Sequence, residues 1–202
     1  MRIGKKITID VRSFISKTPR KVKEEFGVSL INGYMGTGKT YVAVYFLQKY
    51  FKDYKIKTNI KSLNIPGVPE DRIIYVNNIS EIVKDFEEYC IYVLDELGKK
   101  FPKECKMDKD FYNWLQHSRK CKRYVFLIHQ EYLQVPIWLR GICSTVYTTT
   151  KMPLIPIFKT YKGYPFLTED KEWDIQIISV HIYKRNQKIC DMYDTFETVS
   201  LI

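Results

Sequence analysis

Three groups of residues in this chain combine types and spacing that suit phosphate chemistry. The first has the pattern G-x-x-x-x-G-K-T and ends in Lys39 and Thr40. Glycines let the backbone curl so that successive N–H groups face a phosphate, and the positive end of the following helix adds to the attraction. The lysine of this pattern reaches the β- and γ-phosphates, and the threonine hydroxyl is a ligand for Mg²⁺. The pattern therefore predicts a loop for ATP and Mg²⁺, made by Gly33, Tyr34, Met35, Gly36, Thr37, Gly38, Lys39 and Thr40, with Tyr41 next to it.

The second group is a pair of adjacent carboxylates at the end of a short apolar run. Asp95 and Glu96 directly follow residues 91–94, which predict a buried strand. A carboxylate at such a strand end lies beside the phosphate loop, where Asp95 would hold hydrated Mg²⁺. Glu96 would polarise a water molecule for attack on the γ-phosphate. The pair therefore favours hydrolysis over phosphoryl transfer to a metabolite.

The third group is a set of polar side chains that would respond to the γ-phosphate. Gln130 follows the apolar run 124–128 and would sense the γ-phosphate or the attacking water, whereas His129 would point away and be structural. If neighbouring subunits complete each other's sites, an arginine supplied in trans accelerates hydrolysis by about 10³- to 10⁵-fold. Arg119 is the first candidate for this finger and Arg140 the second, and a solvated or phosphate-backbone role stays open for either one.

Alternating apolar and amphipathic segments would position these groups. Buried strands are predicted at residues 28–32, 55–60, 73–76, 91–94, 124–128 and 145–149. Helices are predicted at residues 39–51, 81–89 (with Ser80 as a cap), 108–120 and 133–142. Such alternation predicts an α/β fold, with a mostly parallel sheet and helices on both of its faces.

The chain is expected to divide into three parts. A basic N-terminal arm covers residues 1–25, and the P-loop ATPase core covers residues 26–150. Residues 151–202 form a tail that prolines interrupt. Two strands are expected in this tail, at residues 173–183 and 188–195. They would form a β-hairpin appendage packed on the core rather than a second domain.

Composition limits the class of protein. Thirty-three Lys and Arg against 23 Asp and Glu give a net charge of +10, which favours an anionic partner. The five cysteines include no C-x-x-C pair, and the histidines have no metal-ligand spacing to them, so reduced thiols and no structural zinc are expected. No apolar run approaches the roughly 20 residues that span a bilayer. The protein is therefore expected to be soluble and cytoplasmic, or in the host cytoplasm if it is viral.

Basic residues gather in the N-terminal arm and in one further set between the Asp95-Glu96 strand and the Gln130 strand. This second basic set consists of Lys99, Lys100, Lys103, Lys106, Lys109, Arg119, Lys120, Lys122 and Arg123. Contacts between such residues and phosphates would give salt-sensitive affinity for DNA of any sequence. The alternative interpretation is that these residues form a solvated surface that keeps the protein soluble.

In this order, the motifs resemble the FtsK–HerA superfamily of DNA-pumping ATPases, and within it viral genome-packaging ATPases and the zonula occludens toxin-like proteins of filamentous phages. The residues that carry the resemblance are 33–40, 58–60, 94–96, 101–102, 117–120, 128–130, 139–140 and 191–195. It implies a RecA-like core in a homo-oligomeric ring, often a hexamer, with DNA threaded through its centre and held by basic loops. It also implies Gln130 as sensor, Arg119 as a finger in trans, and a capsid or portal component as a further partner.

The predicted function is an ATP-hydrolysing motor that moves DNA, first of all in viral genome packaging. The toxin-like proteins carry a membrane-spanning segment beyond the ATPase portion, and this chain ends without one, which favours packaging over the alternative of filamentous-virus assembly or export. A P-loop nucleotide kinase is disfavoured by Glu96 and Gln130. A GTPase is a second alternative, because residues 95–98 fit the pattern D-x-x-G. It is disfavoured because the sequence has no N-K-x-D run to bind guanine. A module that uses ATP only to assemble remains a further alternative.

Overall fold

The computed structural model describes residues 26–152, 156–170 and 172–194. The basic arm expected at residues 1–25 and the end of the tail lie outside the described residues. In the part described, no helix is long and apolar enough to cross a membrane.

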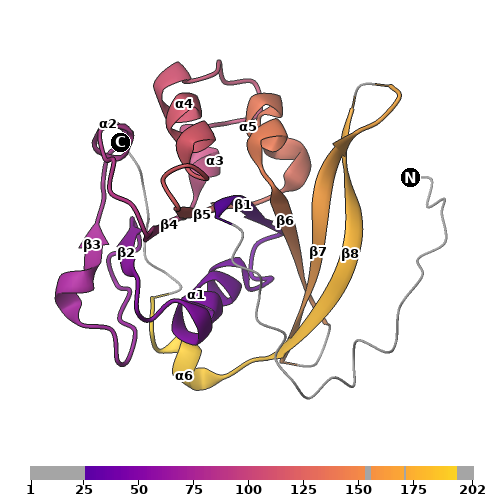
Figure 1. Ribbon diagram of the computed structural model, residues 1–202. Coiled ribbons are helices and arrows are strands. Elements are labelled where there is room, and N and C mark those ends of the chain that lie inside the picture. Colours follow the sequence, from indigo (N-terminus) through magenta and orange to yellow (C-terminus); the bar gives the residue numbers. More distant parts are fainter. Residues whose placement is uncertain (1–25, 153–155, 171, 195–202) are drawn as a thin grey trace.

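Eight strands form one sheet in the order β3-β2-β4-β5-β1-β6-β7-β8 (Figure 1). Their bounds are β1 Gly27–Asn32, β2 Lys55–Thr58, β3 Ile73–Tyr75, β4 Cys90–Leu94, β5 Tyr124–His129, β6 Thr145–Lys151, β7 Ile157–Leu167 and β8 Trp173–Lys184. β1 to β6 pair in parallel, and β7 and β8 add antiparallel pairs. The predicted α/β fold with a mostly parallel sheet is confirmed. β5 separates β1 from β4, so one strand lies between the phosphate-loop strand and the strand that leads to Asp95.

Helices cover both faces of the sheet (Figure 1). On one face lie α1 (Lys39–Tyr50) and α6 (Gln187–Cys190); on the other lie α2 (Ile79–Val83), α3 (Leu97–Lys100), α4 (Lys109–His117) and α5 (Ile137–Ile142). The 3₁₀ turns η2 (Glu70–Arg72) and η3 (Tyr132–Gln134) complete the connections. Strand residues alternate between the two cores: Tyr92 and Leu94 pack under α4, whereas Ile91 and Val93 pack under α1. Because both faces are covered, β4 and β5 are buried at every position, and His129 at the end of β5 is their one polar residue.

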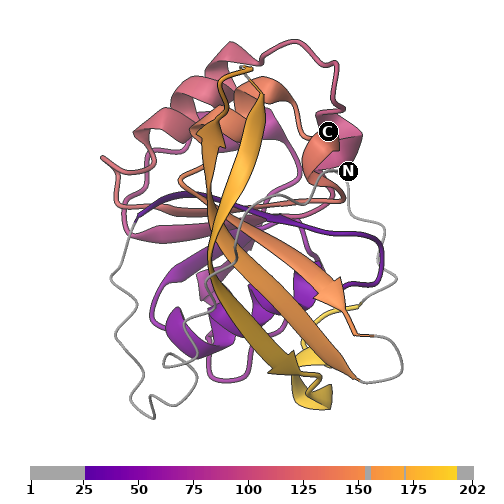
Figure 2. The same cartoon turned by 90° about the vertical axis from the view of Figure 1, so that its right-hand side faces the viewer.

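The tail continues the sheet as a long hairpin in which β7 and β8 pair from Ile157↔Lys184 to Leu167↔Trp173 (Figure 2). The predicted strand at residues 188–195 is wrong, because Asn186 begins α6 there by accepting a hydrogen bond from the Lys188 N–H at 3.0 Å. The hairpin partner of β8 is β7, which the sequence did not reveal because Pro156 precedes the strand and Pro165 lies within it. Pro165 is tolerated because β7 pairs with β6 only as far as Gly163, and beyond that point no strand among the described residues pairs with this edge of β7.

The predicted helix at residues 81–89 is also corrected. α2 ends at Val83, and Asn78 rather than Ser80 caps it, accepting the Ser80 N–H at 2.9 Å. The chain then leaves the helix because Asp85 and Glu87 turn inward to meet two lysines of β2.

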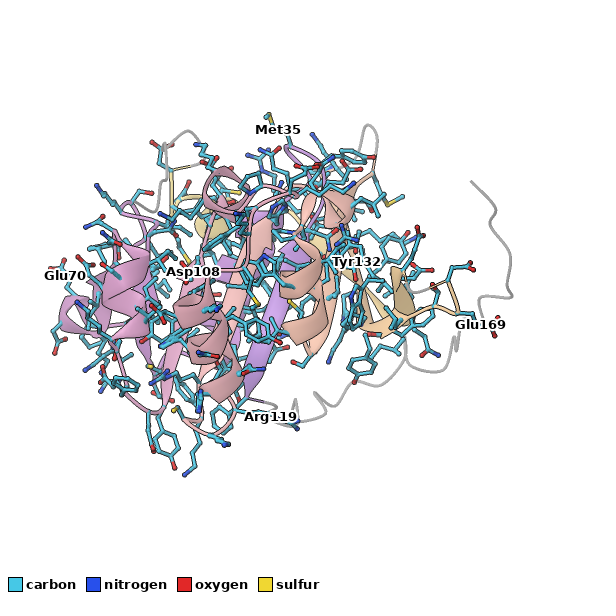
Figure 3. The ribbon with its side chains drawn as sticks, turned by 90° about the horizontal axis from the view of Figure 1, so that it is seen from above. Met35, Glu70, Asp108, Arg119, Tyr132 and Glu169 are labelled. Atoms are coloured by element: carbon cyan, nitrogen blue, oxygen red, sulfur yellow. The ribbon has the colours of Figure 1, made fainter. Side chains whose placement is uncertain are left out.

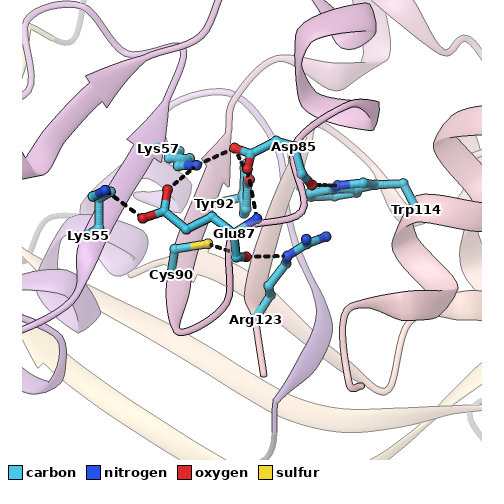
Figure 4. Close-up of polar contacts among 8 residues, drawn as sticks. All are labelled: Lys55, Lys57, Asp85, Glu87, Cys90, Tyr92, Trp114 and Arg123. Carbon is cyan, nitrogen blue, oxygen red and sulfur yellow. Dashed lines mark hydrogen bonds and ion pairs between the residues drawn. The ribbon is translucent and has the colours of Figure 1, made fainter. Parts of the chain in front are cut away.

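These four charged side chains belong to a polar cluster between β2, β4 and α4 (Figure 4). Lys57, 5% exposed, forms ion pairs with Asp85 and, at 2.7 Å, with Glu87. The Tyr92 hydroxyl also donates to Asp85, at 2.6 Å. Burial acts to raise the pKa of Asp85, but the bonds from Lys57 and Tyr92 outweigh it and hold that pKa below its ordinary value.

Arg123 extends this polar cluster by binding the main chain of the segment that carries Asp85 and Glu87. Its Nε donates to the Glu87 carbonyl at 2.8 Å, and its guanidinium lies 5.2 Å from the centre of the Trp114 ring. Trp114 in turn donates its indole N–H to the Asp85 carbonyl at 3.0 Å. Arg123 is 1% exposed, so this member of the second basic set is structural and is not displayed to an anionic partner.

Replacing Lys57 by methionine should lower the free energy of unfolding at pH 7 by roughly 2 kcal/mol, since Asp85 and Glu87 lose a buried partner but keep some contact with water. Asp85 has a lowered pKa in the folded state, so its stabilisation is present above about pH 4 and is lost as the pH falls through the folded value. The variant should therefore lose less stability between pH 7 and pH 3 than the wild type, as measured by urea unfolding. Lys55→Met is the control, because its ion pair with Glu87 is more exposed and should cost less than about 1 kcal/mol. Equal losses for the two variants would contradict this account.

Candidate active site

The phosphate loop connects the end of β1 to the start of α1, and two of its positions accept only glycine. Gly33 and Gly38 have φ angles of +150° and +87°. A Cβ at Gly33 would lie 2.4 Å from the Thr149 carbonyl oxygen of β6, and a Cβ at Gly38 would lie 2.7 Å from the ring of Phe158 of β7. The loop therefore rests directly on β6 and on the first strand of the tail.

Lys39 and Thr37 close the loop on itself. The Lys39 Nζ donates to the Tyr34 carbonyl at 3.0 Å, and the Thr37 hydroxyl donates to the same carbonyl at 2.7 Å. The Thr37 hydroxyl also shares a hydrogen bond with Thr149 at 2.9 Å. Burial lowers the pKa of Lys39, and the nearby charges of Asp95 and Glu96 act against that shift. An anion bound in the loop would favour the charged lysine further.

Thr40 and Asp95 meet at the edge of the sheet where Mg²⁺ is expected. The Thr40 hydroxyl donates to the Asp95 carboxylate at 2.7 Å. Asp95 is 8% exposed, and this burial raises its pKa even though Thr40 and the Glu96 N–H both donate to it. A hydroxyl and a carboxylate fit Mg²⁺, which takes one or two protein oxygens and completes its shell with phosphates and water. A bound cation would favour the ionised carboxylate.

Glu96 lies at a sharp change of chain direction between β4 and α3. Its φ of +54° is in the left-handed region, which is uncommon for a residue with a side chain. Its N–H donates to the Asp95 carboxylate at 2.7 Å, and its own carboxylate forms an ion pair with Lys99, one helical turn later. The two neighbouring carboxylates therefore face different parts of the site: Asp95 faces Thr40, and Glu96 faces the adjacent cleft.

This cleft has a volume of about 440 Å³ and lies beside the phosphate loop. Glu96 and Lys99 line it from one side, Gln130 from the end of β5, and Tyr34 and Met35 from the tip of the loop. Both loop residues are unusually exposed, Tyr34 at 70% and Met35 at 85%. The structure thus brings Glu96 and Gln130 together in one water-accessible space next to the loop.

Gln130 and His129 occupy the end of β5 in different ways. Gln130 is exposed, and its carbonyl accepts the Gly33 N–H at 2.8 Å, which ties the strand end to the phosphate loop. His129 is 3% exposed, and its ring packs against Gly98, where an added Cβ would be 3.1 Å away. Burial lowers the pKa of His129, so a neutral imidazole is favoured.

The two candidate fingers have contrasting environments. Arg140 is 6% exposed, donates to the carbonyls of Val135 and Leu133 at 2.8 and 2.7 Å, and lies 5.2 Å from the ring centre of Tyr132. Its guanidinium stabilises the loop after β5. Arg119 is exposed and lies at the end of the molecule opposite the phosphate-loop tip (Figure 3). Arg119 is therefore far from the cleft of its own chain.

Sequence reasoning missed the residues that support the site from other elements. Thr149 and Phe158 hold the phosphate loop from β6 and β7, and Lys99 pairs with the expected catalytic carboxylate. Two of these residues had a signal in the sequence: Thr149 ends the predicted strand 145–149, and Lys99 lies three residues after Glu96. No sequence signal pointed to Phe158, because its contact with Gly38 depends on the antiparallel pairing of β7.

Comparison with known proteins places the fold and the family. The family model described as zonular occludens toxin (Zot) matches residues 27–199. The crystal structure of the N-terminal domain of zonular occludens toxin from Neisseria meningitidis has a TM-score of 0.56 and 18% identity, covering 84% of this chain and 100% of that chain. The genome packaging NTPase B204 from Sulfolobus turreted icosahedral virus 2, in complex with AMPPCP, has a TM-score of 0.50 and 14% identity, covering 75% of this chain and 97% of that chain. At these identities the likeness shows the fold alone. A search of curated proteins found no match.

Glu96→Gln should retain ATP binding and lower kcat by about 100-fold or more, because an amide keeps the shape of the side chain but cannot accept a proton from water. Nucleotide affinity by calorimetry and phosphate release at saturating ATP measure the two effects. Glu131→Gln is the control, since Glu131 lines the same cleft and accepts a long hydrogen bond from the Tyr34 hydroxyl, at 3.4 Å. Unchanged turnover in Glu96→Gln would remove this residue from the mechanism.

Proposed function

Because this chain belongs to the zonular occludens toxin (Zot) family and is a P-loop ATPase of that type, we propose that it uses ATP hydrolysis to move DNA. The observation that carries the proposal is the convergence of Lys39, Thr40, Asp95, Glu96 and Gln130 at one edge of the sheet. A phosphate loop with only a metal-side carboxylate would suit binding or phosphoryl transfer equally well. The additional carboxylate in a water-accessible cleft favours hydrolysis.

Each residue of this edge has a distinct proposed task. The loop N–H groups and Lys39 hold the phosphates, and Thr40 and Asp95 would hold Mg²⁺, which neutralises charge on the β- and γ-phosphates when bound. Glu96 accepts a proton from the attacking water, and Gln130 orients that water or the γ-phosphate. The ion pair with Lys99 fixes the Glu96 carboxylate at the wall of the cleft before the nucleotide arrives.

DNA is proposed as the moving partner because exposed lysines gather next to the hydrolytic cleft. Lys103 lines the cleft itself, and Lys100, Lys106 and Lys109 are exposed from the end of α3 to the start of α4. Ammonium groups in such numbers favour contact with phosphates rather than recognition of bases, which suits a motor that must pass any sequence. Placing these groups beside Glu96 gives a short route from the DNA contact to the hydrolytic residue.

A homo-oligomeric ring, with six subunits as the expected number, is proposed from the position of Arg119. An exposed arginine at the opposite end of the molecule cannot assist hydrolysis in its own chain (Figure 3). In a head-to-tail ring, each subunit presents one end to the other end of its neighbour, so Arg119 would reach the cleft of the next subunit. The buried Arg140 is not proposed as a finger.

Two settings for DNA movement are proposed. One is genome packaging, in which the motor would meet a capsid or portal component; a genome packaging NTPase has a similar fold. The other is filamentous-virus assembly or export, which is implied by the resemblance of the motifs to the zonula occludens toxin-like proteins of filamentous phages. Both settings need the same hydrolytic edge and the same contact with DNA, so the biochemical proposal is common to them.

Double-stranded DNA of any sequence should raise the rate of ATP hydrolysis, and the effect should weaken as salt rises because the lysines compete with counterions. The measurement is phosphate release at low and moderate salt, with and without DNA. Lys106→Ala together with Lys109→Ala should reduce the stimulation without changing the rate in the absence of DNA, because neither side chain lines the cleft. Hydrolysis that ignores DNA at every salt concentration would contradict the motor, and phosphate transferred to an added nucleoside monophosphate would identify a kinase.

Arg119→Ala should lower DNA-stimulated turnover by about 10³-fold or more in the assembled protein and leave ATP binding unchanged. Mixing it in equal amounts with Glu96→Gln should restore activity at about a quarter of the contacts between subunits, where an intact Glu96 meets an intact Arg119. The neighbouring Lys120→Ala is the control and should hydrolyse ATP normally. Two inactive variants that stay inactive after mixing, although native mass spectrometry shows mixed rings, would contradict a finger in trans.

A further inference from the structure

Asn59 directly follows β2 and is 2% exposed. Its side-chain amide makes two hydrogen bonds to the main chain of one residue, Asp95. The Asn59 Nδ2 donates to the Asp95 carbonyl at 2.9 Å, and the Asp95 N–H donates to the Asn59 Oδ1 at 2.8 Å. A buried side chain that satisfies both polar groups of the residue carrying the metal-side carboxylate is placed to control its position.

The amide continues the ladder between β2 and β4 by one residue. The last paired residues of the two strands are Thr58 and Val93, and the Thr58 hydroxyl also donates to the Val93 carbonyl at 2.8 Å. Beyond this point the backbones separate, because the chain after β4 must turn sharply into the left-handed conformation of Glu96. A primary amide offers the same donor and acceptor as a peptide group, so Asn59 replaces the missing backbone partner.

The loop that follows Asn59 is held by the tail of the chain at two points: the Asn64 N–H donates to the Met192 carbonyl at 2.7 Å, and the Asp194 N–H donates to the Ser62 hydroxyl at 2.8 Å. These bonds limit the movement of the segment that follows Asn59. If that segment were mobile, the Asn59 amide could not hold the Asp95 carboxylate in one position.

We propose that Asn59 is a positioning residue of the active site, which holds the Asp95-Glu96 turn so that Asp95 faces Thr40 and Glu96 faces the cleft. It touches neither nucleotide nor metal and acts through the main chain of Asp95. The inference rests on the proposed function to the extent that Asp95 holds Mg²⁺ and Glu96 is the proton acceptor.

No other side chain of similar size does the same work. Aspartate keeps an acceptor for the Asp95 N–H but has no donor for the carbonyl, and it adds negative charge beside a carboxylate. Alanine or leucine leaves both buried groups of Asp95 without a protein partner. Serine carries its donor and its acceptor on a single oxygen atom of a shorter side chain, so it cannot span the two groups as the amide does.

The test compares Asn59→Ala with Thr58→Val in the whole 202-residue chain. Thr58→Val removes two buried hydrogen bonds, one to the Val93 carbonyl and one from the Ile60 N–H, but it leaves both bonds between the Asn59 amide and Asp95 in place, so it is the matched control. Two readouts decide the matter: the gain in ATP affinity on adding Mg²⁺ to a metal-free titration in EDTA, and kcat at saturating Mg²⁺-ATP. Thermal unfolding of each variant reports the purely structural effect.

Asn59→Ala should reduce the Mg²⁺-dependent gain in affinity and kcat by about tenfold or more each, as is usual when a group that orients a metal ligand is removed. Binding of ATP in EDTA should stay within twofold of the wild type, because the phosphate loop is unchanged. Asn59→Ser should lie between the two, and it decides the question if the alanine variant fails to fold. Thr58→Val should lose stability only.

Two results would overturn the inference. One is an Asn59→Ala protein that loses stability while its Mg²⁺-dependent gain and kcat stay within twofold of the wild type; the other is a Thr58→Val protein with the same losses as Asn59→Ala. A wild-type protein without any Mg²⁺-dependent gain would contradict the proposed function as well, since Asp95 would then hold no metal. The failure of the positioning role alone is thus distinguishable from the failure of the ATPase site.

Discussion

The hydrogen bond from the Thr40 hydroxyl to the Asp95 carboxylate joins the two halves of the site across the sheet edge. It requires the carboxyl ends of β1 and β4 to lie at the same edge, which parallel pairing through the intervening β5 provides. It also requires the phosphate loop to lie at a fixed position relative to this edge, which the close contacts of Gly33 with β6 and of Gly38 with β7 provide. The apolar cores on both faces of the sheet are what hold these strands and α1 in register.

The tail contributes to this arrangement more than an appendage would. Phe158 of β7 supports the phosphate loop at Gly38, and the Tyr41 hydroxyl donates to the Lys184 carbonyl at 3.0 Å. The residues after α6 bind the loop that follows Asn59, as the Asn64–Met192 bond shows. Residues far apart in sequence therefore support both the phosphate side and the metal side of the site. The tail extends the central sheet and supports the site directly.

The sequence was informative where the chemistry is local and less so where it depends on distant contacts. The phosphate loop, Asp95 and Glu96 follow from residue types in a short window, and the strand ends that present them follow from apolar runs. The β7 strand could not be predicted because Pro165 lies where, in the described part of the chain, no strand pairs on the β6 side, which is a property of the assembled sheet. Arg123 and Arg140 resembled the surface arginines around them; only the folded chain places carbonyl oxygens and aromatic rings around their guanidinium groups.

The central claim is that chemistry at this edge of the sheet is converted into movement along DNA. Displacement of a fluorescent third strand from a DNA triplex tests it most directly, because the third strand is released only when a motor passes along the duplex. We expect release that requires ATP hydrolysis, fails with a non-hydrolysable analogue, and takes longer as the duplex track before the triplex is lengthened. ATP turnover stimulated by DNA without any release of the third strand, on short and long tracks alike, would contradict the claim and would identify an ATPase that uses DNA only as an activator.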